Sequence, residues 1–281
     1  MKKTYLLLLF LLALVSFGCQ KNISLNLPKY DNKVVVFCVL QPDFPPAMSL
    51  TLSQSYYSYA DTIGKPTYIT NAQVIITDQN ANTVDTLALD TFSQYNYYGK
   101  HRVVAGHHYI AKITYQGKII TAVTSVPMAV KIDSIDYVKM INAIGPGSID
   151  TSYEFNIFFK DIPGEADYYT LTQSSKYTFN NQETVYNPFT SDTGIDGKQI
   201  EITTQLINYT PTTPAPTFDI YFNIDNANKE TSDYFTNIYA QANNANNPFS
   251  QPIFVSGNIN GGLGLFGAMT PSPGVRVRVV K

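Results

Sequence analysis

The sequence lacks tryptophan and holds only two cysteines and three histidines. Two cysteines cannot build a disulfide framework or a cysteine-based metal site. Charged residues make up 14% of the chain and form no basic stripe, which argues against nucleic acid as a partner. Tyrosine and phenylalanine are abundant, at 21 and 16 residues. Together with Thr, Val and Ile, these residues favour pleated, half-buried surfaces and indicate a mainly β protein.

The N-terminus has the pattern of a secretory signal. Two lysines precede an apolar run over residues 6–15, and Gly18-Cys19 follows. The run is too short to cross a bilayer, which takes roughly 20 apolar residues, and its length and flanks are typical of a cleaved export signal. We expect residues 1–18 to be removed and Cys19 to receive lipid, which would give stable anchoring. The alternative is an ordinary signal cut nearby that leaves Cys19 as a free thiol.

Residues 19–32 are expected to form a lipidated tether, because they are polar and show little periodicity. Gln20 follows the cysteine, and an aspartate that would retain the protein at the inner membrane is missing. An outer-membrane location is therefore favoured. The first acidic residue is Asp31, which weakens the case for display on the outer surface, so the periplasmic and extracellular faces both stay open.

Residues 33–127 show the alternation and turn signals of an antiparallel β-sandwich, which we expect to be immunoglobulin-like. The expected strands are residues 33–40, 48–53, 71–77, 83–87, 109–115 and 118–123. The last two would form a hairpin through Gln116-Gly117, because glycine accepts the positive φ of a tight turn. Cys38 lies within the first strand and is expected to be an inert core residue. Pro127 closes this unit.

Residues 128–281 are expected to form a second, β-rich domain with one helix. The expected strands are residues 132–140, 153–160, 168–179, 199–209, 218–225 and 275–280. The helix is predicted near 231–243, capped by Thr231 or Ser232, because apolar residues there recur at helical spacing. Its aromatic stripe favours packing on a sheet over contact with a cofactor. The fold class is therefore mainly β, with two sandwich-like domains.

Four segments carry a resemblance to a known family. They are the Gly18-Cys19 signal end with strand 33–40, residues 70–78, residues 191–198, and the helix around 234–239 with the 247–252 and 256–268 segments. In these the chain resembles an uncharacterised family of Bacteroidota lipoproteins, domain of unknown function 4249. The resemblance implies that the gene for this protein lies near a gene for a TonB-dependent outer-membrane receptor, as genes of the family often do. It supplies no activity and no catalytic residues.

Gly262, Gly264 and Gly267 have the spacing of a dinucleotide-binding fingerprint. That fingerprint needs a helix N-terminus directly after it, where the helix dipole meets pyrophosphate. Pro271 and Pro273 follow instead and cannot continue a helix. No cofactor is predicted. The expected structure is a glycine hairpin or bulge that turns three apolar side chains inward: Leu263, Leu265 and Phe266.

Asp192 and Asp196 lie in an Asp-Thr-Gly-Ile-Asp-Gly segment that has some features of a calcium loop. A helix–loop–helix calcium site needs oxygen ligands at the third and twelfth loop positions. Gly194 and Thr203 occupy those positions. A turn between strands is therefore favoured over an ion site.

The histidines are His101, His107 and His108. The adjacent pair would point to opposite faces of an extended strand, and the spacing supplies no further zinc ligands. No Gly-x-Ser-x-Gly elbow of a serine hydrolase is present. The sequence thus predicts no metal site, no catalytic residue and no enzyme.

Clustered tyrosines are the candidate ligand or partner surface, because a ring with a polar hydroxyl suits binding. The candidates are Tyr56, Tyr57, Tyr59, Tyr97 and Tyr98. The alternative is that these rings only cover sheet faces and rims.

The leading hypothesis is a non-catalytic lipoprotein held in the outer membrane by its N-terminal lipid. It would bind a glycan or peptide ligand, or assist a TonB-dependent receptor in nutrient capture. One alternative is a carbohydrate-active or carbohydrate-binding surface protein whose acids meet only in the fold. A second alternative is a structural or adhesive surface protein.

Overall fold

The computed structural model describes most of the chain after residue 30. The described residues are 31–54, 65–90, 94–145, 148–175, 183–186, 188–206, 217–244, 249–251 and 253–280. Only the backbone is described for residues 142–145, 148–150, 175, 183–186 and 206. The chain divides into units 1–31 and 32–281, and the fold below concerns the second.

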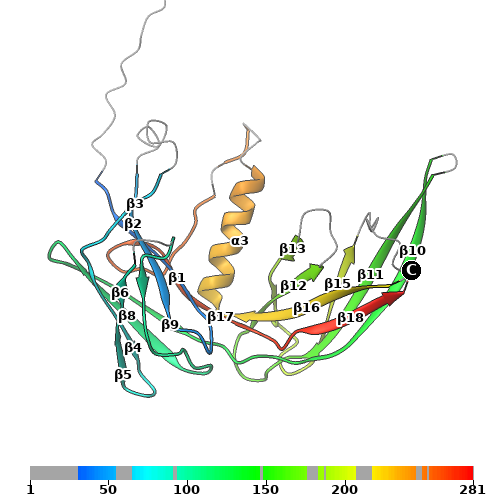
Figure 1. Ribbon diagram of the computed structural model, residues 1–281, viewed down its shortest axis with the longest axis horizontal. Helices are drawn as coiled ribbons and strands as arrows, with labels where there is room; N and C mark the ends of the chain where they lie inside the picture. Colours follow the sequence, from blue (N-terminus) through cyan, green and yellow to red (C-terminus); the bar gives the residue numbers. More distant parts are fainter. Residues whose placement is uncertain are drawn as a thin grey trace, which may run out of the picture. The chain divides into compact units, whose positions relative to one another are not determined.

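The predicted mainly β class is confirmed, and the described residues contain one α-helix, α3 (Lys229–Asn244) (Figure 1). The largest sheet has eleven strands. They are β1 (Val34–Leu40), β2 (Ala47–Leu52), β3 (Thr67–Tyr68), β6 (Ala88–Leu89), β7 (Tyr97–Tyr98), β12 (Tyr168–Ser175), β13 (Glu183–Tyr186), β14 (Thr190–Ser191), β16 (Thr217–Ala227), β17 (Leu263–Pro271) and β18 (Val275–Val280). Among the described helices, none is long and apolar enough to cross a membrane.

A four-stranded sheet contains the hairpin predicted from residues 109–115 and 118–123. Its strands, in sheet order, are β5 (Thr83–Thr86), β4 (Gln73–Asp78), β8 (His108–Tyr115) and β9 (Lys118–Ser125). Gln116 and Gly117 join β8 to β9, and both have positive φ, at 48° and 75°. This pair of dihedral angles suits the right-handed twist of adjacent strands, so the hairpin expected from Gln116-Gly117 is confirmed.

A three-stranded antiparallel sheet contains the longest strands. Its order is β10 (Ile132–Gly145), β11 (Ser148–Lys160) and β15 (Gln199–Leu206). Alternate side chains of β11 are fully buried, including Phe155 and Ile157. This period-two burial places one face of β11 against the core and leaves the other face toward solvent.

The glycine-rich segment forms strand β17, which pairs in parallel with β1 (Figure 1). A Cβ added at Gly264 would lie 2.0 Å from the carbonyl oxygen of Val36, and one at Gly267 would lie 2.1 Å from Thr231 Oγ1. The glycines therefore allow β17 to approach β1 and α3 closely. The expected hairpin or bulge was wrong, because the segment is a strand at the centre of a sheet.

The three apolar side chains of this segment divide between core and solvent. Leu265 and Phe266 are fully buried, as predicted, whereas Leu263 is 41% exposed. Successive side chains of a strand point to opposite faces. Both faces of this part of β17 are covered, because α3 contacts the strand and Phe266 packs in the first hydrophobic cluster. The inward orientation predicted for Leu263 is therefore wrong.

Two hydrophobic clusters fill the fold. The first is built from residues between Val34 and Val126, together with Phe266 and Ala268 of β17. The second is built from residues between Val130 and Val279. Along the sequence, the first cluster reaches Val126 and the second begins at Val130, close to the boundary expected near residue 127. β17 is the exception, because it follows that boundary and yet contributes to the first cluster. The two-domain division itself, and the immunoglobulin-like character of the first domain, stay predictions.

Helix α3 begins two residues before the predicted start, because its cap is Asn228 and not Thr231 or Ser232. The Asn228 side-chain oxygen accepts a hydrogen bond from the Thr231 amide at 3.2 Å, the usual geometry of an N-cap. Its amide nitrogen donates to Thr124 Oγ1 of β9 at 2.5 Å. Asn228 therefore joins the helix start to the four-stranded sheet.

Candidate functional site

Two loops meet at the candidate site. Asp161 follows β11 directly, and Asp192 follows β14 and opens the loop 192–198 that leads into β15. The Asp161 amide donates to the carbonyl of Lys198 at 2.9 Å. Gly194 and Gly197 adopt positive φ, at 84° and 69°, so this segment can turn tightly.

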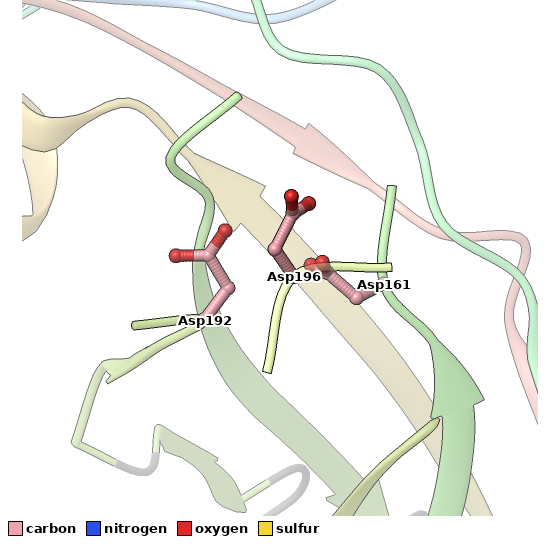
Figure 2. A group of neighbouring side chains, drawn as sticks. All are labelled: Asp161, Asp192 and Asp196. Atoms are coloured by element: carbon pink, nitrogen blue, oxygen red, sulfur yellow. The ribbon is translucent and has the colours of Figure 1, made fainter. Parts of the chain in front are cut away.

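Three carboxylates come together at this meeting point. One carboxylate oxygen from each of Asp161, Asp192 and Asp196 lies within 4.8 Å of the other two. Figure 2 shows the three side chains projecting from neighbouring segments. Asp161 is 2% exposed and Asp192 is 5% exposed, whereas Asp196 is exposed. We call this group the aspartate cluster.

Hydrogen bonds hold two of these carboxylates in place. Asp161 accepts a hydrogen bond from the Tyr169 hydroxyl at 2.7 Å and another from the Gly197 amide at 2.6 Å. Asp196 accepts a hydrogen bond from the Gly164 amide at 2.8 Å. Each loop therefore positions a carboxylate through a backbone amide of the other loop.

Asp192 differs from its two neighbours. Within the described residues, no hydrogen bond or ion pair reaches its carboxylate. The ammonium group of Lys198, on the same loop, lies 3.4 Å from the carbonyl of Gly194 and forms no ion pair with a described carboxylate. The charge of a buried carboxylate is thus left without a partner, which is unfavourable in the folded state.

A fourth carboxylate, Asp167, lies next to the aspartate cluster and is 5% exposed. Its backbone carbonyl accepts a hydrogen bond from the Asp192 amide at 3.2 Å. Its Oδ1 accepts a hydrogen bond from Asn226 at 2.8 Å, while its Oδ2 has no partner. Burial raises the pKa of Asp167, and the charges of Asp161 and Asp192 raise it further, against hydrogen bonds that lower it.

The cluster has the chemistry of a hard-cation site, since it offers carboxylate oxygens and no sulfur or imidazole ligand. Calcium and magnesium prefer such oxygen ligands. Of the carboxylates that line it, sequence reasoning had singled out Asp192 and Asp196 but missed Asp161 and Asp167, which lie on another loop.

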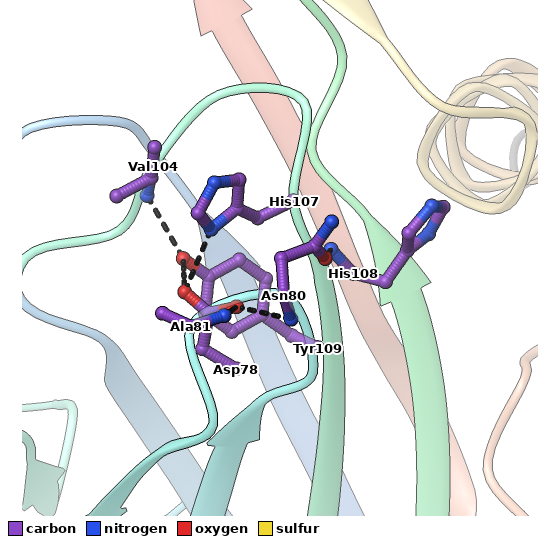
Figure 3. Close-up of polar contacts among 7 residues, drawn as sticks. All are labelled: Asp78, Asn80, Ala81, Val104, His107, His108 and Tyr109. Atoms are coloured by element: carbon purple, nitrogen blue, oxygen red, sulfur yellow. Dashed lines mark hydrogen bonds and ion pairs between the residues drawn. The ribbon is translucent and has the colours of Figure 1, made fainter.

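The second group of polar residues surrounds Asp78 at the end of β4 (Figure 3). The Asn80 and Ala81 amides donate to its Oδ1 at 2.9 and 3.1 Å. His107 Nδ1 lies 2.8 Å from its Oδ2, and the Tyr109 hydroxyl donates to Oδ2 at 3.2 Å. Burial would raise the pKa of Asp78, but these hydrogen bonds outweigh burial and hold the pKa below its ordinary value.

A cleft of about 200 Å³ lies beside this group, and its lining includes Asp78, Asp85, His101 and Tyr109. Asp85 accepts hydrogen bonds from the amides of Lys100 and His101. Both carboxylates therefore brace turns of the backbone. A general acid at neutral pH needs a raised pKa, and the pKa of Asp78 is shifted in the opposite direction.

His107 and His108 point in opposite directions in Figure 3, as the extended-strand geometry predicted. His107 pairs with Asp78, while the His108 backbone amide donates to Asn80 Oδ1 at 2.8 Å. Among the described residues, no group of three histidine, cysteine or acidic side chains with metal-ligand spacing includes a histidine.

Comparison with known protein families identifies one family whose model matches most of the chain. A family model described as a domain of unknown function, DUF4249, matches residues 20–273. The chain belongs to the DUF4249 family. The matched DUF4249 region begins one residue after Cys19 and includes both the aspartate cluster and the Asp78 group. The predicted membership of domain of unknown function 4249 is confirmed, while the Bacteroidota origin, the lipid anchor and the receptor gene neighbourhood stay predictions.

No curated protein matches this DUF4249 chain. Among solved structures, a chain titled "Cytokine receptor complex - Crystal form 1A" is similar at 7% identity with a TM-score of 0.27. The similarity covers 86% of the DUF4249 chain and 94% of that chain. A likeness this distant carries no argument about fold or function.

The remaining predicted site residues of this DUF4249 protein fall in different places. Cys19 and the tyrosines at 56, 57 and 59 lie outside the described residues. Tyr97 is 2% exposed, and its hydroxyl accepts a hydrogen bond from the Ala72 amide at 3.0 Å, so its ring belongs to the core. Tyr98 is half-buried. Cys38 is fully buried in β1, and burial raises the pKa of its thiol to about 12, which makes it inert as predicted.

Proposed function

We propose that this protein is a non-catalytic binding component of the outer membrane, anchored by lipid on Cys19. The observation that carries the proposal is the signal pattern that ends in Gly18-Cys19. The family match begins at residue 20, which supports it, because the matched region would then start directly after the lipid. Cleavage and acylation would leave residues 20–281 as the body outside the bilayer.

We further propose that the body assists a TonB-dependent receptor in nutrient capture, in a Bacteroidota envelope. Support comes from the resemblance of the C-terminal segment and from the aromatic side chains exposed there. Phe249 is 93% exposed, Phe254 is 84% exposed, and Tyr239 of α3 is 48% exposed. Large exposed apolar groups that lie close along the chain are typical of interaction sites.

A non-catalytic role is supported by the partners of the Asp78 group. A histidine–aspartate pair activates a nucleophile only when a serine, cysteine or comparable group lies within hydrogen-bond reach of the histidine. The hydroxyl in this group belongs to Tyr109, which donates to Asp78 and accepts a hydrogen bond from the Val104 amide at 2.9 Å. These contacts order a loop.

The anchor is tested by mass spectrometry of the N-terminal peptide of protein purified from its native cells. Diacylglycerol on the sulfur of Cys19, and accumulation of the precursor under globomycin, are expected. A Cys19→Ala variant should lose membrane association, and the matched Cys38→Ala variant should keep it. An unmodified Cys19 sulfur in native material would overturn the proposal.

The partner is tested by affinity purification from detergent-solubilised membranes. A TonB-dependent receptor should co-purify with the wild-type protein. A Phe249→Ser/Phe254→Ser double variant should recover less receptor, while a Val84→Ser variant, at an exposed position of β5, should recover the same amount. If no receptor co-purifies and gene deletion leaves nutrient uptake unchanged, the accessory role is wrong.

A further inference from the structure

The aspartate cluster has an unbalanced charge. Asp161, Asp192 and Asp196 place three carboxylates within 4.8 Å. Within the described residues, no lysine, arginine or histidine forms an ion pair with any of them. Like charges at this distance repel, and the repulsion is stronger where burial excludes water. An arrangement of this kind is stabilised by a bound cation.

Two unpartnered groups give a second indication, independent of the acidic composition. Asp192 as a residue is 95% buried, and its carboxylate has no hydrogen-bond or ion-pair partner among the described residues. The carboxylate supplies one of the three converging oxygens, so it points into the cluster. From outside the cluster, the buried Oδ2 of Asp167 also has no partner. Buried polar atoms are nearly always hydrogen-bonded or bound to a metal ion.

The hydrogen bonds within the cluster fix the carboxylates but leave ligand positions open. A carboxylate has about four lone-pair sites. Asp161 uses one for Tyr169 and one for Gly197, and Asp196 uses one for Gly164. At least one lone pair on every carboxylate therefore stays open for a cation, while the loops hold the side chains in position before binding.

We propose that Asp161, Asp192 and Asp196 bind a calcium ion. Calcium takes six to eight oxygen ligands at about 2.3–2.6 Å in flexible geometry, so opposite ligands lie about 4.6–5.2 Å apart. Three carboxylate oxygens within 4.8 Å of one another fit around such an ion, with water completing the shell. Magnesium requires shorter, near-ideal octahedral contacts. The charge of Asp167 interacts with those of Asp161 and Asp192 and adds to the negative potential at the cluster.

Calcium at this position would join two sheets. Asp161 follows β11 of the three-stranded sheet, whereas Asp192 follows β14, which pairs with β12 in the eleven-stranded sheet. A ligand that binds only the folded state stabilises it by mass action. The ion therefore has a structural role, and the site stands apart from the proposed anchoring and receptor binding.

The test uses the full-length protein in detergent micelles, stripped with a chelator and then titrated with calcium chloride. We expect a dissociation constant on the order of 10⁻⁴–10⁻³ M, as in extracellular calcium modules, and a rise in the thermal midpoint with calcium concentration. Terbium should bind the same site and emit on tyrosine excitation, since the Tyr169 hydroxyl lies 2.7 Å from Asp161 Oδ1.

Substitutions locate the site. Asp192→Asn and Asp196→Asn should each weaken calcium binding by about tenfold or more, because the number of ligand charges sets affinity. Asp196 is exposed, so its variant keeps the test valid if the Asp192 variant fails to fold. Asp133→Asn, an exposed acid on β10, is the matched control and should bind as the wild type does.

Three results would each overturn the proposal. The first is no heat and no shift of the thermal midpoint up to about 10 mM calcium, ten times the weakest affinity expected of an extracellular module. The second is an equal response to magnesium. The third is a folded Asp196→Asn variant with unchanged affinity.

Discussion

At the scale of single residues, the buried carboxylates differ by their partners. Asp78 pairs with His107 and accepts hydrogen bonds from two turn amides and from Tyr109, whereas Asp225 accepts one from Thr172. The pKa of Asp78 is therefore lowered, while burial raises the pKa of Asp225 despite that hydrogen bond. The ionised form of Asp78 therefore stabilises the folded state, whereas the ionised form of Asp225 destabilises it.

We predict that Asp78→Asn lowers the free energy of unfolding by about 1–3 kcal/mol at pH 7, because buried donors lose a charged acceptor. A lowered folded-state pKa contributes stability that is fully present above the unfolded pKa of about 3.9 and is lost as pH falls through the folded value. The difference from wild type should therefore shrink below about pH 4. Urea unfolding of the variant and the wild type at pH 7 and pH 3 measures this difference in unfolding free energy, with Asp133→Asn as the control. A difference that does not change with pH would contradict this assignment.

Gly264 is a residue whose conformation and surroundings both exclude a side chain. Its φ is 105°, and an added Cβ would lie 2.0 Å from the Val36 carbonyl oxygen. We expect Gly264→Ala to lower the free energy of unfolding by more than about 3 kcal/mol, since backbone strain and overpacking add.

Gly117→Ala is the matched control for that substitution. Gly117 has φ of 75° with nothing within 4 Å of an added Cβ, so only the backbone cost of about 1–2 kcal/mol should remain. Denaturant unfolding of both variants measures the difference. If both variants lose the same free energy of unfolding, β17 and β1 leave room for a side chain at Gly264 and the prediction is wrong.

At the scale of elements, Asn228 connects three parts of the fold. It caps α3, donates to Thr124 of β9, and its backbone amide donates to the carbonyl of Ala268 in β17 at 3.3 Å. Helix α3 therefore gains its position from a single side chain as well as from its packed face.

We predict that Asn228→Ala lowers the free energy of unfolding by about 1–3 kcal/mol, through the lost cap and the unpartnered Thr231 amide. Hydrogen exchange of the first-turn amides of α3 should accelerate. Thr236→Ala, exposed in the same helix, should change little. Unchanged exchange in the first turn would show that Thr231 or Ser232 caps the helix instead.

The elements that sequence reasoning predicted well depend on local patterns. Alternation located β2, and Gly117 located the β8–β9 turn, because both signals lie within a few residues. The pairing of β1 with β17 is different, since the two strands lie at opposite ends of the chain. Periodicity carries no information about which distant strand is the neighbour, and the glycines of β17 weakened its strand signal.

The aspartate cluster shows the same limit. Asp192 and Asp196 share one loop, so their spacing could be compared with known calcium loops. Asp161 precedes Pro163-Gly164, which signals a turn after a strand. Nothing in the sequence places that turn against residues 192–198, because the contact depends on how β11 pairs with β15.

At the scale of the whole molecule, the first hydrophobic cluster is incomplete without β17, which lies far along the chain from the cluster's other residues. Phe266 and Ala268 of β17 are fully buried in it. We predict that a fragment of residues 20–127 does not fold alone, although a domain boundary was expected at its end. Its circular dichroism and denaturant response should be those of an unfolded chain. Cooperative unfolding of the isolated fragment would instead establish the N-terminal domain as independent.

The position of β17 also has a consequence for biosynthesis. β1 leaves the ribosome long before β17, its parallel neighbour, because β1 ends at Leu40 and β17 begins at Leu263. A nascent chain therefore carries an apolar strand with one edge open for almost the whole period of elongation, and an open edge can pair with other chains. This part of the fold can form only after β17 has been made, and a holdase chaperone that covers β1 would protect the polypeptide until then.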